Sequence, residues 1–479
     1  MRWSLCLALG LGVLAVATGP ARAQATAEGA AKLQAALEAW QPSVGTLSLD
    51  ELKDATQRIP VPFSVSDWRV TPDGDGYRVE TPGFRWLLSQ AIDQFQQPYV
   101  ISCDAETLRA MPAPEGRFTL SSDRLLSCGL DNVGRITAQS RHVSGTVDPA
   151  PGASTEITVT LDQATFGPWQ TRAPTIDRLE LTRTARSRAD GRSDIAARIA
   201  ISGLSLFFPD GTGSLTIDQG LFDCGMPGFD AHGLVRAAVA LATDAGHPAG
   251  ADSAALQDRL VAALGEASTS TLTAGGLRAE RNGIAIKLAS LAFGLGYRNL
   301  ARDSGDVTVR LDAAGIATEP AWANGAWTPT AGTIQISIED FPIWQIFAAS
   351  FAGRQMDEAA EQRLLREARI RILFDTVRLT APEAGLDFGG TIATNPDAVL
   401  GSAGALKLRL TGIDGLVKAL QADPKASEAV AGLTMLQVLG RQVTAPDGKP
   451  ARDYDIVIDP SGKVLVNGTD IQALVPKDL

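Results

Sequence analysis

Residues 334–340 read Ile-Gln-Ile-Ser-Ile-Glu-Asp, and this stretch decides the fold class because apolar and polar side chains alternate along it. A period of two places the three isoleucines on one face of a strand and the polar residues on the other face. The pattern therefore predicts a strand that belongs to an antiparallel sheet.

Similar runs precede this stretch and are separated by residues that favour turns. Segments 72–76 and 148–152 are rich in Asp, Gly and Pro, and segment 185–194 has the Arg, Ser and Gly composition of a solvated hairpin tip. We expect strands at 64–71, 77–81, 118–120, 134–147, 155–161, 176–182 and 195–208. Residues 61–210 are therefore predicted to form an antiparallel β meander.

A recurring unit follows, in which an alternating run ends in an acid and precedes two helical patterns. Asp218, Asp340 and Asp414 are these acids, and an Asp at an N-cap accepts hydrogen bonds from the first free N–H groups of a helix. The expected helix pairs lie at 229–245 and 253–264, at 341–351 and 358–368, and around 416–420 and 424–439. We divide this part into a first unit at 211–330, a second at 331–405, and a third at 406–479 that closes with a hairpin around Asp459–Gly462.

The start of the chain has helical periodicity. Leu33, Leu37 and Trp40 recur at helical spacing, so helices are expected within residues 24–60. The predicted fold class is α+β and β-rich, with curved antiparallel sheet and packed helix hairpins in degenerate strand and helix-pair repeats.

Residues 1–23 have the pattern of a secretory signal peptide. Arg2 precedes an apolar run from Leu5 to Ala17, and Ala21-Arg22-Ala23 is a small-residue cleavage site. We expect cleavage after Ala23, export to the periplasm, and no transmembrane segment in the mature chain, because the apolar run is shorter than the roughly 20 residues of a membrane span.

Export gives the cysteines a structural interpretation. The mature chain has Cys103, Cys128 and Cys224, and an oxidising compartment favours a disulfide. Cys103 and Cys128 both follow apolar runs and are the preferred pair, while the two pairings that use Cys224 stay open.

The composition argues against several functions. The chain has 43 Lys and Arg against 54 Asp and Glu, without a basic cluster, so nucleic acid is not an expected partner. Its three histidines are isolated and it lacks the spacing of known nucleophile, phosphate-binding or metal motifs. We therefore assign no catalytic residue, no metal ligand and no cofactor, and we expect a protein that is not an enzyme.

The most apolar predicted helix lies at 341–351. Its side chains, which include Trp344, Phe347 and Phe351, cover more than one helix face, so they must be buried on several sides or contact an apolar ligand. These three residues are the candidate ligand-binding side chains, and the alternative is a helix packed into the concave face of a sheet.

Two hairpin sequences and the recurring units carry a resemblance. Residues 70–79 (VTPDGDGYRV) and 462–468 (GKVLVNG), together with the signal sequence, resemble bacterial envelope proteins of the YdgA and AsmA-like groups and of an alphaproteobacterial domain family of unknown function. For AsmA-like proteins, the resemblance implies a role at the cell envelope and lipid binding along a β-sheet groove. It supplies no catalytic residue.

Three hypotheses about function follow. The first is a non-enzymatic periplasmic protein that binds a lipid or another apolar ligand in a β-sheet groove. The second is a structural scaffold that binds an envelope protein partner and no ligand, and the third is a secreted hydrolase.

Overall fold

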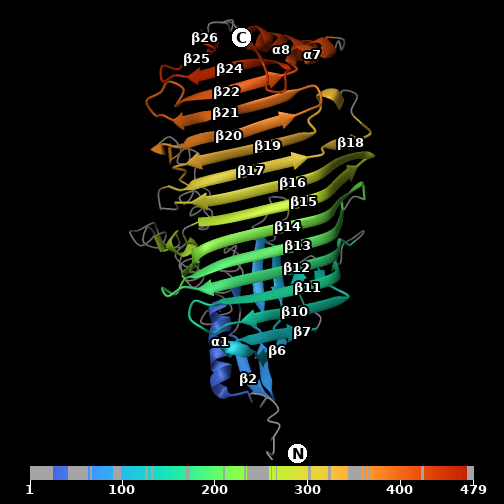
Figure 1. Ribbon diagram of the computed structural model, residues 1–479, viewed down its shortest axis with the longest axis vertical. Helices are drawn as coiled ribbons and strands as arrows, with labels where there is room; N and C mark the ends of the chain where they lie inside the picture. The colour runs from blue at the N-terminus through green and yellow to red at the C-terminus, as the bar shows by residue number, and fades with distance from the viewer. Residues whose placement is uncertain are drawn as a thin grey trace, which may run out of the picture.

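The computed structural model describes residues 25–40, 63–64, 67–89, 99–123, 128–130, 134–167, 173–208, 211–230, 267–299, 304–321, 325–342, 367–421 and 426–471, with a few shorter pieces between them. The strands of this part of the chain form one large antiparallel sheet whose long strands stack along the molecule (Figure 1).

Short elements form the N-terminal part. They are α1 (Ala27–Trp40), β1 (Phe63–Ser64), β2 (Arg69–Asp73), β3 (Gly76–Glu80), β4 (Phe84–Ser89), β5 (Tyr99–Cys103), β6 (Thr107–Pro112), η1 (Pro114–Gly116), β7 (Phe118–Ser122), β8 (Cys128–Leu130) and β9 (Gly134–Thr137).

Longer strands form the body of the sheet. They are β10 (Ser140–Val147), β11 (Ser154–Gly167), β12 (Thr175–Ser187), β13 (Ser193–Phe207), β14 (Gly213–Phe229), β15 (Ala267–Arg281), β16 (Ile284–Arg298), β17 (Asp306–Ala314), β18 (Ala317–Glu319), β19 (Ala331–Glu339), β20 (Arg371–Thr380), β21 (Gly385–Thr394) and β22 (Ser402–Thr411), with η2 (Gly325–Trp327) before β19.

The C-terminal part adds a helix pair and a hairpin. Its elements are α7 (Ile413–Leu420), α8 (Ser427–Leu439), β23 (Arg441–Thr444), β24 (Pro450–Ile458), β25 (Val464–Val466) and β26 (Thr469–Asp470).

Strand pairing follows chain order through most of the sheet. From β10 to β17 each strand pairs with the next, and the series continues through β19, β20, β21 and β22 to β24. At the N-terminal end the series β2, β3, β6 and β7 joins β10. A second series, β1, β4, β5, β8 and β9, joins β11.

The structure confirms the β-rich antiparallel prediction and several of its elements. The helix with Leu33 and Leu37, most of the meander strands and both hairpin sequences form as expected. The strands expected at 64–71 and 134–147 are each divided in two, into β1 and β2 and into β9 and β10. β1 pairs with β4 and β2 with β3, whereas β9 and β10 share β11 but pair on their other side with β8 and β7. Of the predicted helix pairs, the described residues include the last one as α7 and α8, while most of the other two lie outside them. The signal peptide also lies outside the described residues, and the repeat stays a prediction. The expected unit boundary at 405/406 falls inside β22.

Two of the proposed cap residues were wrongly placed. Asp218 lies within β14, which continues for eleven residues to Phe229, so it does not end a strand. Asp414 lies in the first turn of α7, whose N-cap is Gly412 with a φ of 75°. Glycine adopts this left-handed conformation without a Cβ clash, which lets β22 turn directly into the helix. Asp340 has a φ of 55°, and the helix expected after it lies outside the described residues.

A crease crosses the sheet from β11 to the end of β17. On alternate strands, residues at the same level have a positive φ, between 50° and 65°: Gln163, Gly203, Gly276 and Gly315. The ladder pairing is interrupted at this level on each successive strand pair and resumes in the same register beyond it.

The crease inserts one residue into the side-chain alternation of each strand. On β11, buried Leu161 and Ala164 are three positions apart, yet both belong to one apolar cluster, and Ile201 and Leu204 on β13 repeat this spacing. A positive φ permits this change of face, as it does in a β-bulge. The sheet can therefore bend at the crease and keep its apolar side chains on one face.

Aspartates of the intervening strands fill the crease. The Asp177 carboxylate accepts a hydrogen bond from Gln163 at 3.3 Å and lies against Gly203, and Asp218 lies against Gly276 in the same way. A Cβ at either glycine would overlap the facing carboxylate. These positions need glycine for its conformation and for its lack of a side chain.

Cys103 and Cys128 form a disulfide, as predicted. They are directly opposite each other on β5 and β8, with Cα atoms 4.1 Å apart, whereas Cys224 is a free, half-buried thiol. The bond closes the chain around β6 and β7, which pair with other strands of the sheet. It therefore joins β5 and β8 within the second N-terminal series and closes a loop that contains two strands of the first series.

Replacing both Cys103 and Cys128 with Ser is expected to lower the free energy of unfolding by about 3 kcal/mol, because the unfolded chain regains the entropy of an open loop. Urea unfolding without reductant measures this change. Cys224→Ser is the control and should change stability far less. Equal losses in the two variants would contradict a stabilising role of the disulfide.

Gly276→Ala is expected to destabilise the protein more than Gly283→Ala. Both glycines have a positive φ, 62° and 77°. An alanine in this left-handed conformation costs about 1–2 kcal/mol, so both variants should lose that much of the free energy of unfolding. An added Cβ meets open space at Gly283 but the Asp218 carboxylate at Gly276, which adds about 1–3 kcal/mol of overpacking. Equal unfolding free energies for the two variants would show that the crease tolerates a side chain.

Candidate functional site

The register of the sheet collects apolar side chains on one face, which we call the apolar face. Residues directly opposite each other on neighbouring strands point to the same face, so a row of side chains can be followed from strand to strand. The central row contains Val159, Leu181, Ile199, Phe222, Leu272, Phe293, Leu311, Ile334, Val377, Phe388, Leu408 and Tyr454.

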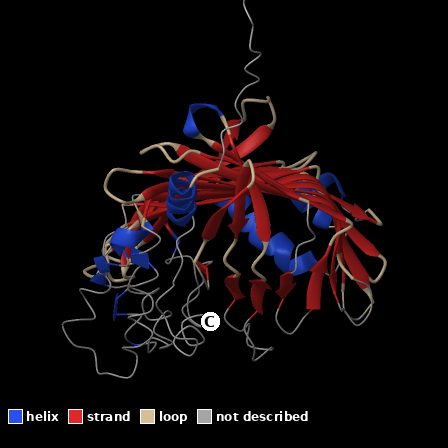
Figure 2. Ribbon diagram, turned by 90° about the horizontal axis from the view of Figure 1, so that it is seen from below, coloured by secondary structure: helices blue, strands red, loops and turns tan. Residues whose placement is uncertain are grey.

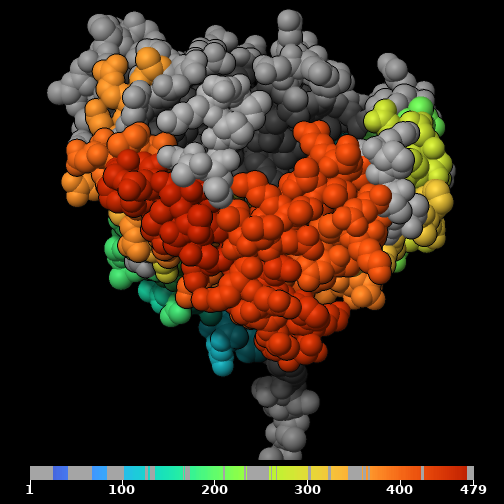
Figure 3. Space-filling view, turned by 90° about the horizontal axis from the view of Figure 1, so that it is seen from above, coloured from blue at the N-terminus to red at the C-terminus, as the bar shows by residue number. Residues whose placement is uncertain are grey.

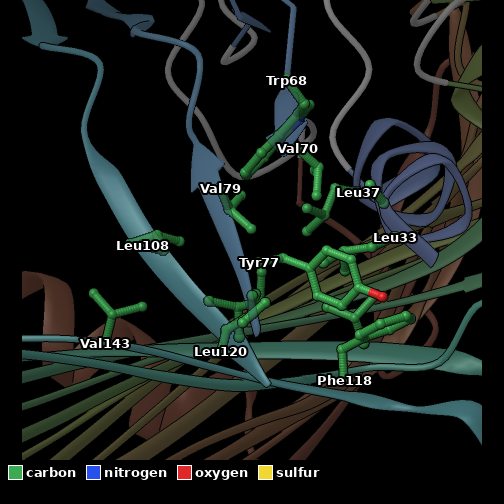
Figure 4. Packing of buried hydrophobic residues seen from close by; sticks show 14 residues of the cluster. Leu33, Leu37, Trp68, Val70, Tyr77, Val79, Leu108, Phe118, Leu120 and Val143 are labelled. Carbon is green, nitrogen blue, oxygen red and sulfur yellow. The ribbon is translucent and has the colours of Figure 1, made fainter. Parts of the chain in front are cut away.

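The N-terminal end of the apolar face is covered. Leu33 and Leu37 of α1 are fully buried in one cluster with Tyr77, Val143 and Ile157 (Figure 4). Trp40 at the end of α1 donates a hydrogen bond from Nε1 to the carbonyl oxygen of Arg183, at 3.4 Å. This end of the face therefore serves as an ordinary core.

The C-terminal end is covered as well. Tyr454, the last residue of the central row, is 2% exposed and donates a hydrogen bond to the Leu436 carbonyl oxygen of α8, at 2.8 Å. Arg452 of the same strand binds the Asp414 carboxylate. The orange and red segments that contain α7, α8 and β24 form this end of the molecule (Figure 3).

The middle of the apolar face keeps large side chains exposed. Leu272 on β15 and Phe293 and Leu295 on β16 are 42%, 39% and 41% exposed. Leu272 and Phe293 are directly opposite each other, and Leu295 follows on the same face, so the three form one surface that we call the open patch.

The apolar face is the concave one. Seen along the stack of strands, the sheet is arched, and α1 and the α7–α8 pair lie inside the arch (Figure 2). Because these helices pack on the apolar face at its two ends, the open patch lies in the hollow between them.

The opposite, polar face contains ion pairs, some between neighbouring strands and some within one strand. Arg198 binds Asp223, Arg310 binds Asp312 and Arg409 binds Asp453. The hydrogen bonds of Arg409 to both Asp453 oxygens, at 2.7 and 2.8 Å, lower the pKa of that carboxyl below its usual value.

A trough of about 860 Å³ crosses the polar face from β12 to β20. Its floor consists of short side chains such as Ala200, Ser290 and Ala331, and charged side chains lie at its ends. Arg178 and Arg378 at these ends form ion pairs with neighbouring carboxylates. Since these charges are already paired, the trough is a weaker ligand site than the open patch.

The predicted ligand-binding side chains Trp344, Phe347 and Phe351 lie outside the described residues. The open patch was not predicted. Its signal was the alternation of Leu291, Phe293 and Leu295 with Ala292 and Gly294, which resembles any half-buried strand.

The described residues contain no group of three His, Cys, Asp or Glu side chains that could hold a metal ion. Of the three histidines the structure describes His142, which is exposed and hydrogen-bonded to Asp123 at 2.7 Å. Among the described helices, none combines the length and the apolar character needed to cross a bilayer.

Comparisons with protein-family models, with curated proteins and with solved structures gave no match to this chain. The resemblance to YdgA and AsmA-like proteins therefore stays a prediction.

Acid is expected to weaken the pair between Arg409 and Asp453. The folded-state pKa of Asp453 is lowered from 3.8, so the pair contributes stability above that pH and loses it as the pH falls through the lowered value. In urea unfolding between about pH 6 and about pH 3, Asp453→Asn should show a smaller loss of stability than the unmodified chain. The control, Asp455→Asn on the same strand, removes a looser 3.7 Å pair with Arg441 and should keep the acid-dependent loss.

Proposed function

We propose that this chain is a non-enzymatic protein of the bacterial periplasm, and that it binds a lipid or another elongated apolar ligand on its apolar face. The observation that carries the proposal is the open patch. Leu272, Phe293 and Leu295 remain about 40% exposed in the middle of a face whose two ends are covered by helices.

The energy of burial favours an apolar ligand there. Each buried Å² of apolar surface contributes about 25 cal/mol, so three large, half-exposed side chains leave a substantial part of their burial energy unused. Contiguous apolar surface of this kind is typical of ligand or partner sites. The concave shape of the face suits a ligand that lies along the row and contacts several strands at once.

The periplasmic part of the proposal rests on two features. The first is the signal-like sequence of residues 1–23. The second is the disulfide between Cys103 and Cys128, because such bonds persist in oxidising compartments.

The alternative is a scaffold whose apolar face contacts a protein of the cell envelope and no lipid. The two functions differ in what the purified chain binds. A scaffold should bind no apolar small molecule at the open patch, whereas a lipid-binding protein should bind it without another protein.

Replacing Leu272 and Phe293 together with Ser is expected to weaken binding of the neutral fluorescent probe N-phenyl-1-naphthylamine. Each lost contact is worth about 1 kcal/mol at this exposure, so the pair should raise the dissociation constant roughly tenfold or more. Fluorescence titration of the purified chain measures this constant, and urea unfolding checks that the variant folds.

The matched control is Val457→Ser. Val457 is 39% exposed, like the open patch, but it lies on the polar face of β24. Its replacement should leave probe binding unchanged. Absence of probe binding to the unmodified chain, together with no lipid in extracts of chain purified from the periplasm, would support the scaffold.

A further inference from the structure

Among the described residues, Arg141, Arg183 and Arg452 lie on the apolar face, and two of these three are ion-paired. A further arginine, Arg281, lies at the edge of this face beyond the crease, with its guanidinium over the Phe208 ring. Arg141 lies under the N-terminal elements and binds Glu106, and Arg452 at the other end binds Asp414. Arg183 on β12 is the third, and the structure gives it no described carboxylate partner. Arg183 therefore differs from the other two, and it lies on β12, at the N-terminal border of the open part of the face.

The surroundings of Arg183 are apolar. Its guanidinium lies over the Trp40 ring, 4.8 Å from the ring centre, and the residues directly opposite it are Ile157 and Ala197. This desolvation lowers the pKa of Arg183 to about 10, which still leaves the side chain charged at neutral pH. Arg183 is half-buried, so its charge lacks part of the water that would normally stabilise it.

A lane of small side chains connects Arg183 to the open patch. The residues that face each other on successive strands form a row that starts at Arg183. This row continues through Ala197, Cys224 and Ser270 and ends at Leu295 of the open patch. Bulky residues flank this lane in the central row, where Phe222 and Leu272 stand beside Cys224 and Ser270. From β12 to β16 the lane is about 19 Å long at the usual spacing of strands, which is comparable to a long extended alkyl chain.

We infer that the ligand is an anionic amphiphile with a single long alkyl chain, whose head group binds the Arg183 guanidinium and whose chain lies along the lane toward Leu295. This inference rests on the proposed function and adds the ligand's charge and orientation. A carboxylate or phosphate would supply charge-assisted hydrogen bonds to the N–H groups of a guanidinium that already stacks on Trp40. The alkyl chain would cover the open patch.

The test compares two ligands that share the same chain, hexadecanoate and 1-hexadecanol, by displacement of N-phenyl-1-naphthylamine. We expect the unmodified chain to bind hexadecanoate roughly tenfold or more tightly than the alcohol, the usual effect of a hydrogen bond to a charged group. Arg183→Gln should abolish this preference, because it weakens the binding of hexadecanoate far more than the binding of 1-hexadecanol.

Two further variants keep the test decisive. Arg183→Lys restores the charge and should recover part of the preference for hexadecanoate, even where Arg183→Gln fails to fold. Arg178→Gln removes an exposed, ion-paired arginine of the same strand on the polar face and should keep the full preference.

The outcomes separate this inference from the proposed function. Equal binding of the acid and the alcohol by the unmodified chain would overturn the role of Arg183 and leave the apolar site standing. The same role would fall if Arg183→Gln kept the preference. Binding of neither ligand would overturn the apolar site itself.

Discussion

The fold depends on one constraint, which is that the side chains of the central row stay matched from strand to strand between β11 and β24, although bulges shift the pairing elsewhere in β13–β14, β19–β20 and β20–β21. Side chains alternate with a period of two, so a slip of one residue on any strand would turn all its apolar side chains to the polar face. The central row shows that no such slip occurs between Val159 on β11 and Tyr454 on β24. The covered ends, the open patch and the position of Arg183 all follow from this continuity.

The crease solves a conflict between this constraint and curvature. A β-bulge, which is one extra residue in a strand, lets a sheet bend. The side chains that follow the extra residue along that strand then normally point to the opposite face. Here the extra residue occurs at the same level on successive strands, with positive φ at positions such as Gly203 and Gly276. All strands change face together, so neighbouring side chains stay matched and the apolar surface continues across the bend.

Sequence reasoning predicted local features well and long-range ones poorly. The run 334–338, the terminal hairpin and the Cys103–Cys128 pair could be predicted because each depends on short spacing and turn chemistry. The length of β14 was missed because Gly220 and Gly225 interrupt its apolar pattern, and Asp218 resembles a helix cap when the facing Gly276 is unknown.

The site was missed for a related physical reason. Arg183 stands between two threonines near an Arg-rich hairpin, so the sequence suggests a solvated side chain. Only the register places it on the apolar face, beside Trp40 of a distant helix and in line with Leu295. Such a site is assembled from one residue per strand, and its first and last residues, Arg183 and Leu295, are more than a hundred positions apart in the sequence.

The apolar face itself provides the contrast that distinguishes a site from a core. At its N-terminal end, Val143 and Ile157 are at most 5% exposed beneath α1, and at its C-terminal end Tyr454 is 2% exposed beneath α8. The same face, built with the same kinds of side chain, leaves Leu272 and Phe293 open between these ends. Core formation alone would favour covering the whole face, because exposed apolar area costs free energy everywhere along it. The exposed area lies in the middle of the face, and Arg183 lies at its border. An amphiphile would cover the exposed side chains with its alkyl chain and pair with the arginine through its head group.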